Sequence, residues 1–300
     1  MSDHLNNKKT DFGCNILGPV FYIFCQKLYS FLNKQRGTTV CLYAFRGGVR
    51  LHFLFDKFLS NKKLTVRSKQ DLFYVSRILV VKCGLYKSYD RAEKIILNEY
   101  NRFDFSSFVE CFCPGIVTNL PPDMKNIQLS SEVLKRTFFG QDEWAKAIQN
   151  YLHSQDKLFN KYFHTLTNDY ENIVFIDTGW GGTIQFFLME MYPDKNFHGI
   201  YFGKWKFWNH QFSHKATGLF VEGDSLDHNK PETAIFEYHH IIESPLEPSI
   251  PSVESIIKDT NGLIGSSKDI NVNFIPPQKN EYIFQGIVNF FDLAYKKSEL

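Results

Sequence analysis

The feature that most constrains the fold is an apolar segment that runs directly into a glycine-rich turn. Residues 173–176 are all apolar, and residues 179–182 contain three glycines. A helical pattern of apolar side chains follows over residues 184–191, and a second apolar strand pattern covers residues 199–203. A strand, a helix and a strand within about thirty residues form a right-handed crossover unit, so we expect a central sheet that is at least partly parallel.

The N-terminal region supplies further parts of the same sheet. Residues 38–45 are β-branched and apolar, which predicts a strand, and the glycine pair after them predicts a turn at residues 46–48. A helix over residues 49–59 follows that turn. Residues 72–77 predict a second short strand with a polar end, and residues 18–32 predict a helix that packs on the sheet.

The middle of the chain carries apolar and charged residues at intervals typical of helices, and its tail is rich in proline. We therefore predict an α/β fold in which a mostly parallel sheet with flanking helices carries a helical insertion. The helices expected in the insertion cover residues 90–100, 132–139 and 142–166. We predict a single domain over residues 1–300. Its core covers residues 16–87 and 170–250, the helical insertion covers residues 88–169, and a wrapping C-terminal extension covers residues 251–300.

Composition and charge argue against several classes of protein. The chain has 300 residues, of which 43% are hydrophobic, enough to bury a sizeable core. The 34 basic and 32 acidic residues nearly cancel, so no overall positive field favours nucleic acid, and we expect no nucleic-acid partner. The cysteines show no Cys-x-x-Cys spacing, and no secretory signal is evident. Residues 16–24, the longest apolar stretch, are about half as long as a membrane span. These features predict a cytoplasmic protein.

Three predicted strands end in polar residues or glycines. The carboxyl ends of parallel strands meet at one edge of a sheet, which is where such sheets bind ligands. We therefore expect the residues at these three ends to converge on one site. They are Arg46, Gly47, Gly48, Ser76, Arg77, Asp177, Thr178, Gly179, Trp180, Gly181, Gly182 and Thr183.

The glycine-rich turn favours an anionic ligand. Glycines let the backbone approach a phosphate closely, and the following helix presents free N–H groups with a partial positive charge. Asp177 is expected to accept hydrogen bonds from sugar hydroxyls or to hold a metal-bound water, unless it caps the helix. Arg46 and Arg77 are expected to clamp a pyrophosphate or carboxylate group, the alternative being surface arginines in tight turns.

A later segment holds further candidates. Glu237, Glu243 or Glu247 could serve as a general base or a metal ligand, although each, taken singly, is more typical of a solvated or capping carboxylate. The adjacent His239 and His240 would point to opposite faces of a strand, which argues against zinc.

The sequence resembles one known family. Residues 176–185, Ile-Asp-Thr-Gly-Trp-Gly-Gly-Thr-Ile-Gln, resemble the Asp-x-Gly-Trp-x-Gly-Thr-x-Gln signature of glycan-directed phosphoribosyltransferases. These enzymes work in the assembly of bacterial surface polysaccharides, in capsule and lipopolysaccharide, often beside a phosphatase of the haloacid dehalogenase type. The resemblance consists of scattered motifs within residues 16–250, the others being residues 42–48, 74–77, 199–203 and 243–245.

This resemblance implies a type I phosphoribosyltransferase-like core that binds phosphoribosyl pyrophosphate with Mg²⁺. Residues 179–183 would hold the 5-phosphate, Asp177 the ribose hydroxyls and the metal, and residues 46–48 the pyrophosphate, with Glu243 also contacting substrate. Transfer of 5-phosphoribofuranosyl to a glycan hydroxyl would release pyrophosphate and leave a phosphate for a partner phosphatase to remove. Asp177 and Arg46 are the expected catalytic residues, and the catalytic base is unassigned.

Two alternatives stay open. A nucleotide-sugar glycosyltransferase would use the same turn for its diphosphate. A non-catalytic phosphosugar-binding partner subunit is suggested by Gly47, because the family pattern has Arg-Asp-Gly at a turn where this chain has Arg-Gly-Gly.

A lipid-linked acceptor would place the protein at the inner membrane face, where Trp205 and Trp208 with their neighbouring lysines could rest. These tryptophans equally suit a platform for a sugar ring or a place in the core.

Overall fold

The computed structural model describes residues 2–116, 120–205, 210–223, 225–258, 264–266 and 275–298. At its centre lies a five-stranded sheet in which all neighbouring strands are parallel, in the order β2-β1-β3-β4-β5. The strands are β1 (Thr39–Ala44), β2 (Lys69–Phe73), β3 (Asn172–Trp180), β4 (Asn196–Trp205) and β5 (Ala216–Gly223). The predicted α/β fold with a mostly parallel sheet and flanking helices is confirmed.

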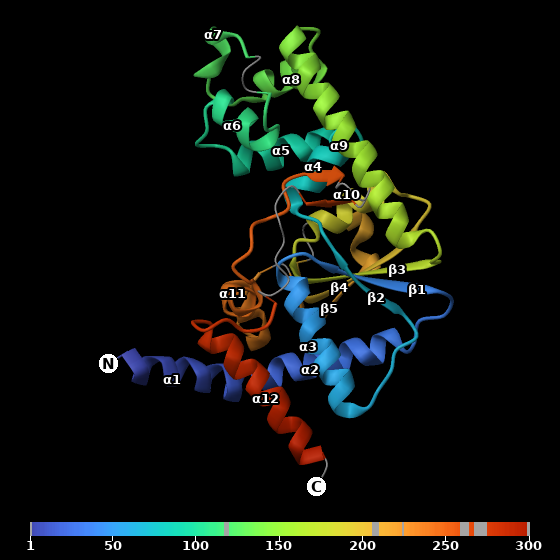
Figure 1. Cartoon of the computed structure of the whole chain (residues 1–300), viewed down its shortest axis with the longest axis vertical. Coiled ribbons are helices and arrows are strands. Elements are labelled where there is room, and N and C mark those ends of the chain that lie inside the picture. The colour runs from blue at the N-terminus through green and yellow to red at the C-terminus, as the bar shows by residue number, and fades with distance from the viewer. Residues whose placement is uncertain are drawn as a thin grey trace.

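Helices cover both faces of this sheet (Figure 1). One face is covered by α2 (Gly18–Leu32), α3 (Gly47–Lys62) and α12 (Tyr282–Ser298), and the other by α4 (Arg77–Gly84), α9 (Glu143–Thr167) and α10 (Thr183–Met191). Side chains alternate along β3, so that Ile173 and Phe175 join the core beneath α9, whereas Val174 joins the core beneath α2. Burial on both faces is the reason this strand reads as a continuous apolar run.

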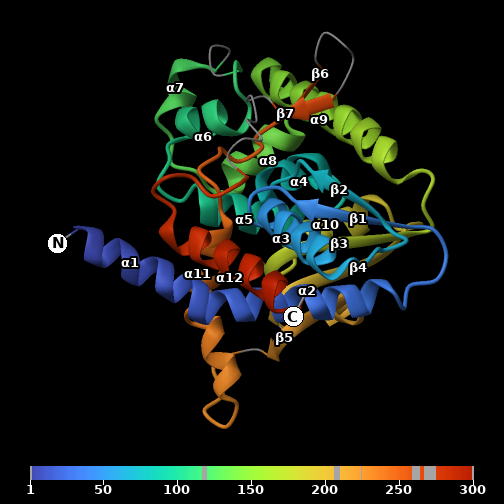
Figure 2. The same ribbon diagram turned by 60° about the horizontal axis from the view of Figure 1, so that its bottom comes forward.

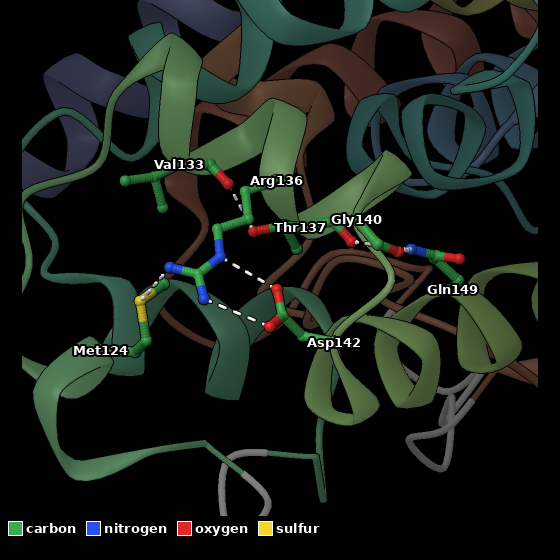
Figure 3. Close-up of polar contacts among 7 residues, drawn as sticks. All are labelled: Met124, Val133, Arg136, Thr137, Gly140, Asp142 and Gln149. Carbon is green, nitrogen blue, oxygen red and sulfur yellow. Dashed lines mark hydrogen bonds and ion pairs between the residues drawn. The ribbon is translucent and has the colours of Figure 1, made fainter.

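The helical insertion lies between β2 and β3 in the sequence and forms a lobe at one end of the molecule (Figure 1). It comprises α5 (Tyr89–Glu99), α6 (Phe105–Phe112), α7 (Pro122–Lys125) and α8 (Ser131–Phe139), and α9 leads back to the sheet. At the corner between α8 and α9, Arg136 donates to both carboxylate oxygens of Asp142 over 2.9 and 3.3 Å (Figure 3). Gln149 donates to the Gly140 carbonyl oxygen over 2.9 Å and ties α9 to the same corner.

The first and last helices lie side by side (Figure 2), at the end of the molecule opposite to this lobe (Figure 1). Helix α1 (Ser2–Phe12) continues through a π-helical turn, η1 (Gly13–Leu17), into α2, and α12 packs against all three. A Cβ atom at Gly13 would lie 2.1 Å from the carbonyl oxygen of Ile283, and one at Gly286 would lie 2.1 Å from that of Thr10. Glycine is therefore required on both helices, and the C-terminal extension is anchored to the start of the chain.

The remaining described elements follow β4 and β5. They are η4 (His210–Lys215), η5 (Pro231–Phe236), α11 (His240–Leu246) and the antiparallel pair β6 (Ile256–Lys258) and β7 (Ile264–Ser266). None of the helices in the described part of the chain combines the length and apolar character needed to cross a bilayer.

Two predicted strand boundaries were wrong. The strand predicted over residues 72–77 ends at Phe73, and the apolar residues 78–81 that follow the predicted strand belong to α4. That helix starts here because Ser76 caps it, its hydroxyl accepting the N–H of Leu79 over 3.1 Å. Conversely, β3 extends to Trp180 because its backbone stays paired with β4 beyond the apolar run.

Candidate functional site

A cleft of about 710 Å³ opens at the carboxyl ends of β1 and β3. Helix α3 follows β1 on one face of the sheet, whereas α10 follows β3 on the other, so the two helices diverge and leave a crevice between them. This is the topological switch point of an open parallel sheet, the position at which such sheets bind ligands. The outer walls are formed by α5, α6, α11 and residues 252–254.

The glycine-rich turn forms the floor of this cleft. Gly179 has φ 129° and lies so close to β4 that a Cβ atom would be 2.4 Å from the carbonyl oxygen of Gly203. Gly182 has φ 65° and is the N-cap residue of α10, where it has no side chain with which to cap the helix. Because Gly182 provides no side-chain cap, the first N–H groups of α10 can bind an anion in the cleft.

Buried hydrogen bonds hold this helix end in place. The Tyr201 hydroxyl on β4 donates to Oε1 of Gln185 over 2.7 Å, and Nε2 of Gln185 donates to the carbonyl oxygen of Lys215 over 2.7 Å. Both side chains are almost fully buried, so either partner left alone would be an unsatisfied polar group. The first turn of α10 is thereby fixed to two neighbouring parts of the fold.

Two glycines bring α3 close to β3. A Cβ atom at Gly47 would lie 2.9 Å from Cγ2 of Thr178, and one at Gly48 would lie 3.0 Å from the carbonyl oxygen of Ile176. Gly47 lines the cleft, whereas Gly48 packs against the sheet and is not among the lining residues. The glycine pair thus serves close packing as well as access to the cleft.

Asp177 lies partly buried on β3, beside the turn. Its Oδ1 accepts the backbone N–H of Thr178 over 2.8 Å. Burial raises the pKa of Asp177 to about 7, and the carboxylates of Glu243 and Glu247 also act to raise it, while the hydrogen bonds from Thr178 oppose the change. Both protonation states of Asp177 are therefore populated near neutral pH. The alternative that this residue caps α10 was wrong, because Gly182 occupies the N-cap position.

A second carboxylate faces the turn from α11. Oε1 of Glu243 accepts the indole N–H of Trp180 over 2.8 Å, and its Oε2 lies 3.8 Å from Nε2 of His239. Burial raises the pKa of Glu243, against the lowering effect of the Trp180 hydrogen bond and of His239. The predicted strand through His239 and His240 is instead the start of α11, so these two side chains are not held on opposite faces of a sheet.

The cleft contains two arginines, and both are ion-paired. Arg46 pairs with Glu247, the residue after α11, and donates to the Ser252 hydroxyl over 3.3 Å, while its buried Nε has no hydrogen-bond partner among the described residues. Its backbone has φ 81°, which is strained for a residue with a side chain. Arg77 pairs with Glu99 on α5. An anionic ligand would have to share or displace these carboxylates.

The C-terminal extension closes one side of the cleft. The Ser76 hydroxyl donates to the carbonyl oxygen of Val253 over 2.5 Å, and buried Lys82 donates to that of Glu254 over 2.6 Å. Gln155 on α9 exchanges two hydrogen bonds with the backbone of Ile256, over 2.8 and 3.2 Å. Three side chains, two from α4 and its N-cap and one from α9, thus hold one short segment of backbone against the site.

Carboxylates outnumber cations along the cleft. Against Arg46 and Arg77 stand the five acids Glu99, Asp177, Glu243, Glu247 and Glu254. Among the described residues no three histidine, cysteine or acidic side chains are grouped as a metal cage. Mg²⁺ is usually held by one or two carboxylates together with substrate phosphates, and Asp177 beside an open helix N-terminus fits that donor set.

The structure brings nearly all of the predicted site residues together. Those that line the cleft are Arg46, Gly47, Ser76, Arg77, Asp177, Thr178, Gly179, Trp180, Gly181, Gly182, Thr183 and Glu243. Trp205 and Glu247 also line it, whereas Glu237 does not, and Trp208 lies outside the described residues. Tyr201 lies in the predicted strand of residues 199–203, but its place in the cleft was not predicted. No sequence pattern marked the other lining residues Glu99, Tyr100, Cys111, Ser252, Val253 and Glu254.

No protein-family model matches the chain, and no curated protein shows significant similarity to it.

Proposed function

We propose that this protein is a phosphoribosyltransferase, a glycosyltransferase that moves 5-phosphoribofuranosyl from phosphoribosyl pyrophosphate to a sugar hydroxyl of a bacterial surface glycan. The observation that carries the proposal is the open N-terminus of α10 behind Gly182, which shares the switch-point cleft with Asp177 and Arg46. Backbone N–H groups at a helix start bind a phosphate without a dedicated cation. The resemblance of residues 176–185 to the family signature supplies the choice of donor.

The residues of the cleft have distinct roles in this proposal. The backbone from Gly179 to Thr183 binds the 5-phosphate, and Asp177 accepts hydrogen bonds from the ribose hydroxyls. Arg46 and the N–H of Gly47 stabilise the negative charge that develops on the departing pyrophosphate. Gly48 is not included, because it packs on the sheet.

Acidic side chains outnumber basic ones in the cleft, and this favours a donor that is bound as its complex with a metal ion. Free pyrophosphate would be repelled by the carboxylates around it, whereas Mg²⁺ would supply the compensating positive charge on the leaving group. Asp177 is the residue that would hold the metal, and its ionised form is the one that binds. We therefore expect donor binding to require Mg²⁺.

The test compares two isosteric variants at the phosphate site. Asn and Asp both tolerate the left-handed backbone of Gly182, and a Cβ atom there meets only the Tyr201 hydroxyl at 3.6 Å. Gly182→Asp adds a negative charge that stabilises the helix start but repels phosphate, so it should fold and lose the donor. Gly182→Asn carries no charge, so it should bind the donor more tightly than Gly182→Asp, although its amide oxygen can compete for the same N–H groups and weaken binding relative to wild type.

Binding is measured as the rise in unfolding temperature with phosphoribosyl pyrophosphate and Mg²⁺, roughly 2.7 kcal/mol of stabilisation at a hundredfold excess over Kd. Equal temperature rises for the Asp and Asn variants would contradict the phosphate site. Stabilisation by a nucleoside diphosphate sugar alone would favour a nucleotide-sugar transferase. Donor binding without pyrophosphate release, with a panel of sugar acceptors present, would favour a non-catalytic partner subunit, the alternative that Gly47 suggests.

The chemistry of the proposed product and acceptor determines which further partners the protein requires. A 5-phosphoribosyl glycan retains a phosphate, so a phosphatase must act after this enzyme. A lipid-linked acceptor would require the protein to work from the cytoplasm at the inner membrane face.

A further inference from the structure

We infer that His239 is the general base that accepts the proton of the acceptor hydroxyl, an assignment that rests on the proposed transferase function. His239 precedes α11 and lines the same cleft as the glycine-rich turn, with 38% of its side chain exposed. An imidazole is suited to proton transfer near neutral pH.

A hydrogen bond to the backbone fixes the tautomer of the His239 ring. Nδ1 of His239 lies 3.2 Å from the carbonyl oxygen of Phe236, three residues earlier in the chain. A carbonyl oxygen can only accept, so Nδ1 carries the proton of the neutral ring. The lone pair is then on Nε2, the nitrogen that faces Glu243 in the cleft. This is the arrangement that a general base needs, with the non-reacting nitrogen held by a backbone acceptor.

The surroundings of His239 stabilise the imidazolium that forms when the ring accepts the proton. Oε2 of Glu243 lies 3.8 Å from Nε2, close enough to stabilise the imidazolium that forms when Nε2 takes the proton of the acceptor hydroxyl. The other oxygen of Glu243 is held by the Trp180 indole, so the carboxylate is fixed in this position. Glu243 thereby acts on the proton transfer through His239.

The position of the ring is fixed by aromatic neighbours. The centroid of the His239 ring lies 5.8 Å from that of Trp180 and 6.0 Å from that of Trp205, both at steep interplanar angles. Trp180 belongs to the strand end that carries the proposed phosphate site, which places His239 beside the donor half of the cleft. The partly exposed Trp205 offers an apolar face on which the acceptor sugar can lie.

The step balances as a simple displacement. The acceptor oxygen forms a bond to the anomeric carbon as the bond from that carbon to pyrophosphate breaks, and pyrophosphate leaves with the bonding electrons. The acceptor O–H proton passes to Nε2 of His239. The imidazolium then releases this proton to solvent, and the ring returns to its starting tautomer.

The chain offers a matched control in the next residue. His240 is exposed and does not line the cleft. We compare His239→Ala, His239→Gln and His240→Ala for donor binding, by thermal unfolding with phosphoribosyl pyrophosphate and Mg²⁺, and for turnover, as pyrophosphate release with a panel of methyl hexopyranosides. We expect both His239 variants to bind donor within about threefold of wild type while turnover falls roughly 100-fold or more. His240→Ala should be unchanged in both.

Added imidazole should restore part of the turnover of His239→Ala, which a purely structural role would not allow. Wild-type turnover in a His239 variant that binds donor would overturn the assignment of His239 as the general base and leave the proposed function standing. A wild-type protein that gains no stability from the donor would overturn the proposed function and the assignment with it.

Discussion

The indole N–H of Trp180 donates to Oε1 of Glu243 over 2.8 Å and joins the end of β3 to α11, 63 positions later in the chain. This bond connects the glycine-rich turn, which the proposal assigns to the donor, to the helix that carries Glu243 and follows His239. It lies at the point in the cleft where donor and acceptor would meet.

Trp180→Phe should destabilise the protein by about 1–3 kcal/mol, because it leaves the half-buried carboxylate of Glu243 without its donor. The Trp180 bond lowers the pKa of Glu243, so its loss should raise that pKa and make the destabilisation larger at pH 8 than at pH 5. Urea unfolding at the two pH values measures this. In a Glu243→Gln background the same substitution should cost equally at both pH values, and a pH-dependent cost there would contradict the explanation.

Asp177→Asn should stabilise the protein at pH 8. Burial raises the Asp177 pKa from 3.8 to about 7, so the folded state binds more protons than the unfolded state between these values. Wild-type stability therefore falls as pH rises through this window, whereas the amide avoids the penalty and still accepts the Thr178 N–H. The gain is at most ~4 kcal/mol, because each tenfold change in the proton affinity of the carboxylate on folding corresponds to about 1.4 kcal/mol. Chemical unfolding from pH 4 to 8 should show the two proteins converging towards pH 4; a constant offset would contradict the assignment.

Sequence patterns predicted the parts of the fold that depend on local signals. The apolar run of residues 173–176 marked β3, and the apolar spacing over residues 18–32 marked α2 at its observed ends. The half-buried residues of β5 carry no comparable run, and it was not predicted. Ser76 was assigned to a strand because its neighbours are apolar, although its hydroxyl caps a helix.

The candidate site likewise has one part that local sequence signals predicted and another that depends on the folded backbone. Glycines and polar residues directly after strands identified the floor of the cleft. Residues 252–254 reach the cleft through side chains that hold their backbone carbonyls, such as Ser76 and Lys82, and such contacts leave no pattern in the sequence. The role of His239 depends on the carbonyl of Phe236, which only the folded backbone places.

Arg46→Gly should be more stable than Arg46→Ala, although both variants remove the ion pair with Glu247. The backbone at position 46 has φ 81°, which glycine adopts freely and alanine does not. The strain costs about 1–2 kcal/mol for alanine, and the greater freedom of unfolded glycine offsets about 0.4–1 kcal/mol of it. We expect Arg46→Gly to exceed Arg46→Ala by about 1 kcal/mol in urea unfolding. Both should lose donor binding; equal stabilities would show that the backbone here is unstrained.

Gly47→Ala should destabilise the protein by about 1–3 kcal/mol, because its Cβ atom would lie 2.9 Å from Cγ2 of Thr178. Thr178→Ser removes that methyl group and keeps the hydroxyl, so the double variant should recover most of the lost stability.

Gly48→Ala is the control. Its Cβ atom would lie 3.0 Å from the backbone oxygen of Ile176, and no side-chain change relieves that contact. Urea unfolding of the single and double variants gives a coupling energy for each pair with Thr178→Ser. We expect a favourable coupling of about 1 kcal/mol or more for Gly47→Ala and none for Gly48→Ala. Additive effects at position 47 would mean that the first glycine of the turn is required for access to the cleft alone and not for packing against β3.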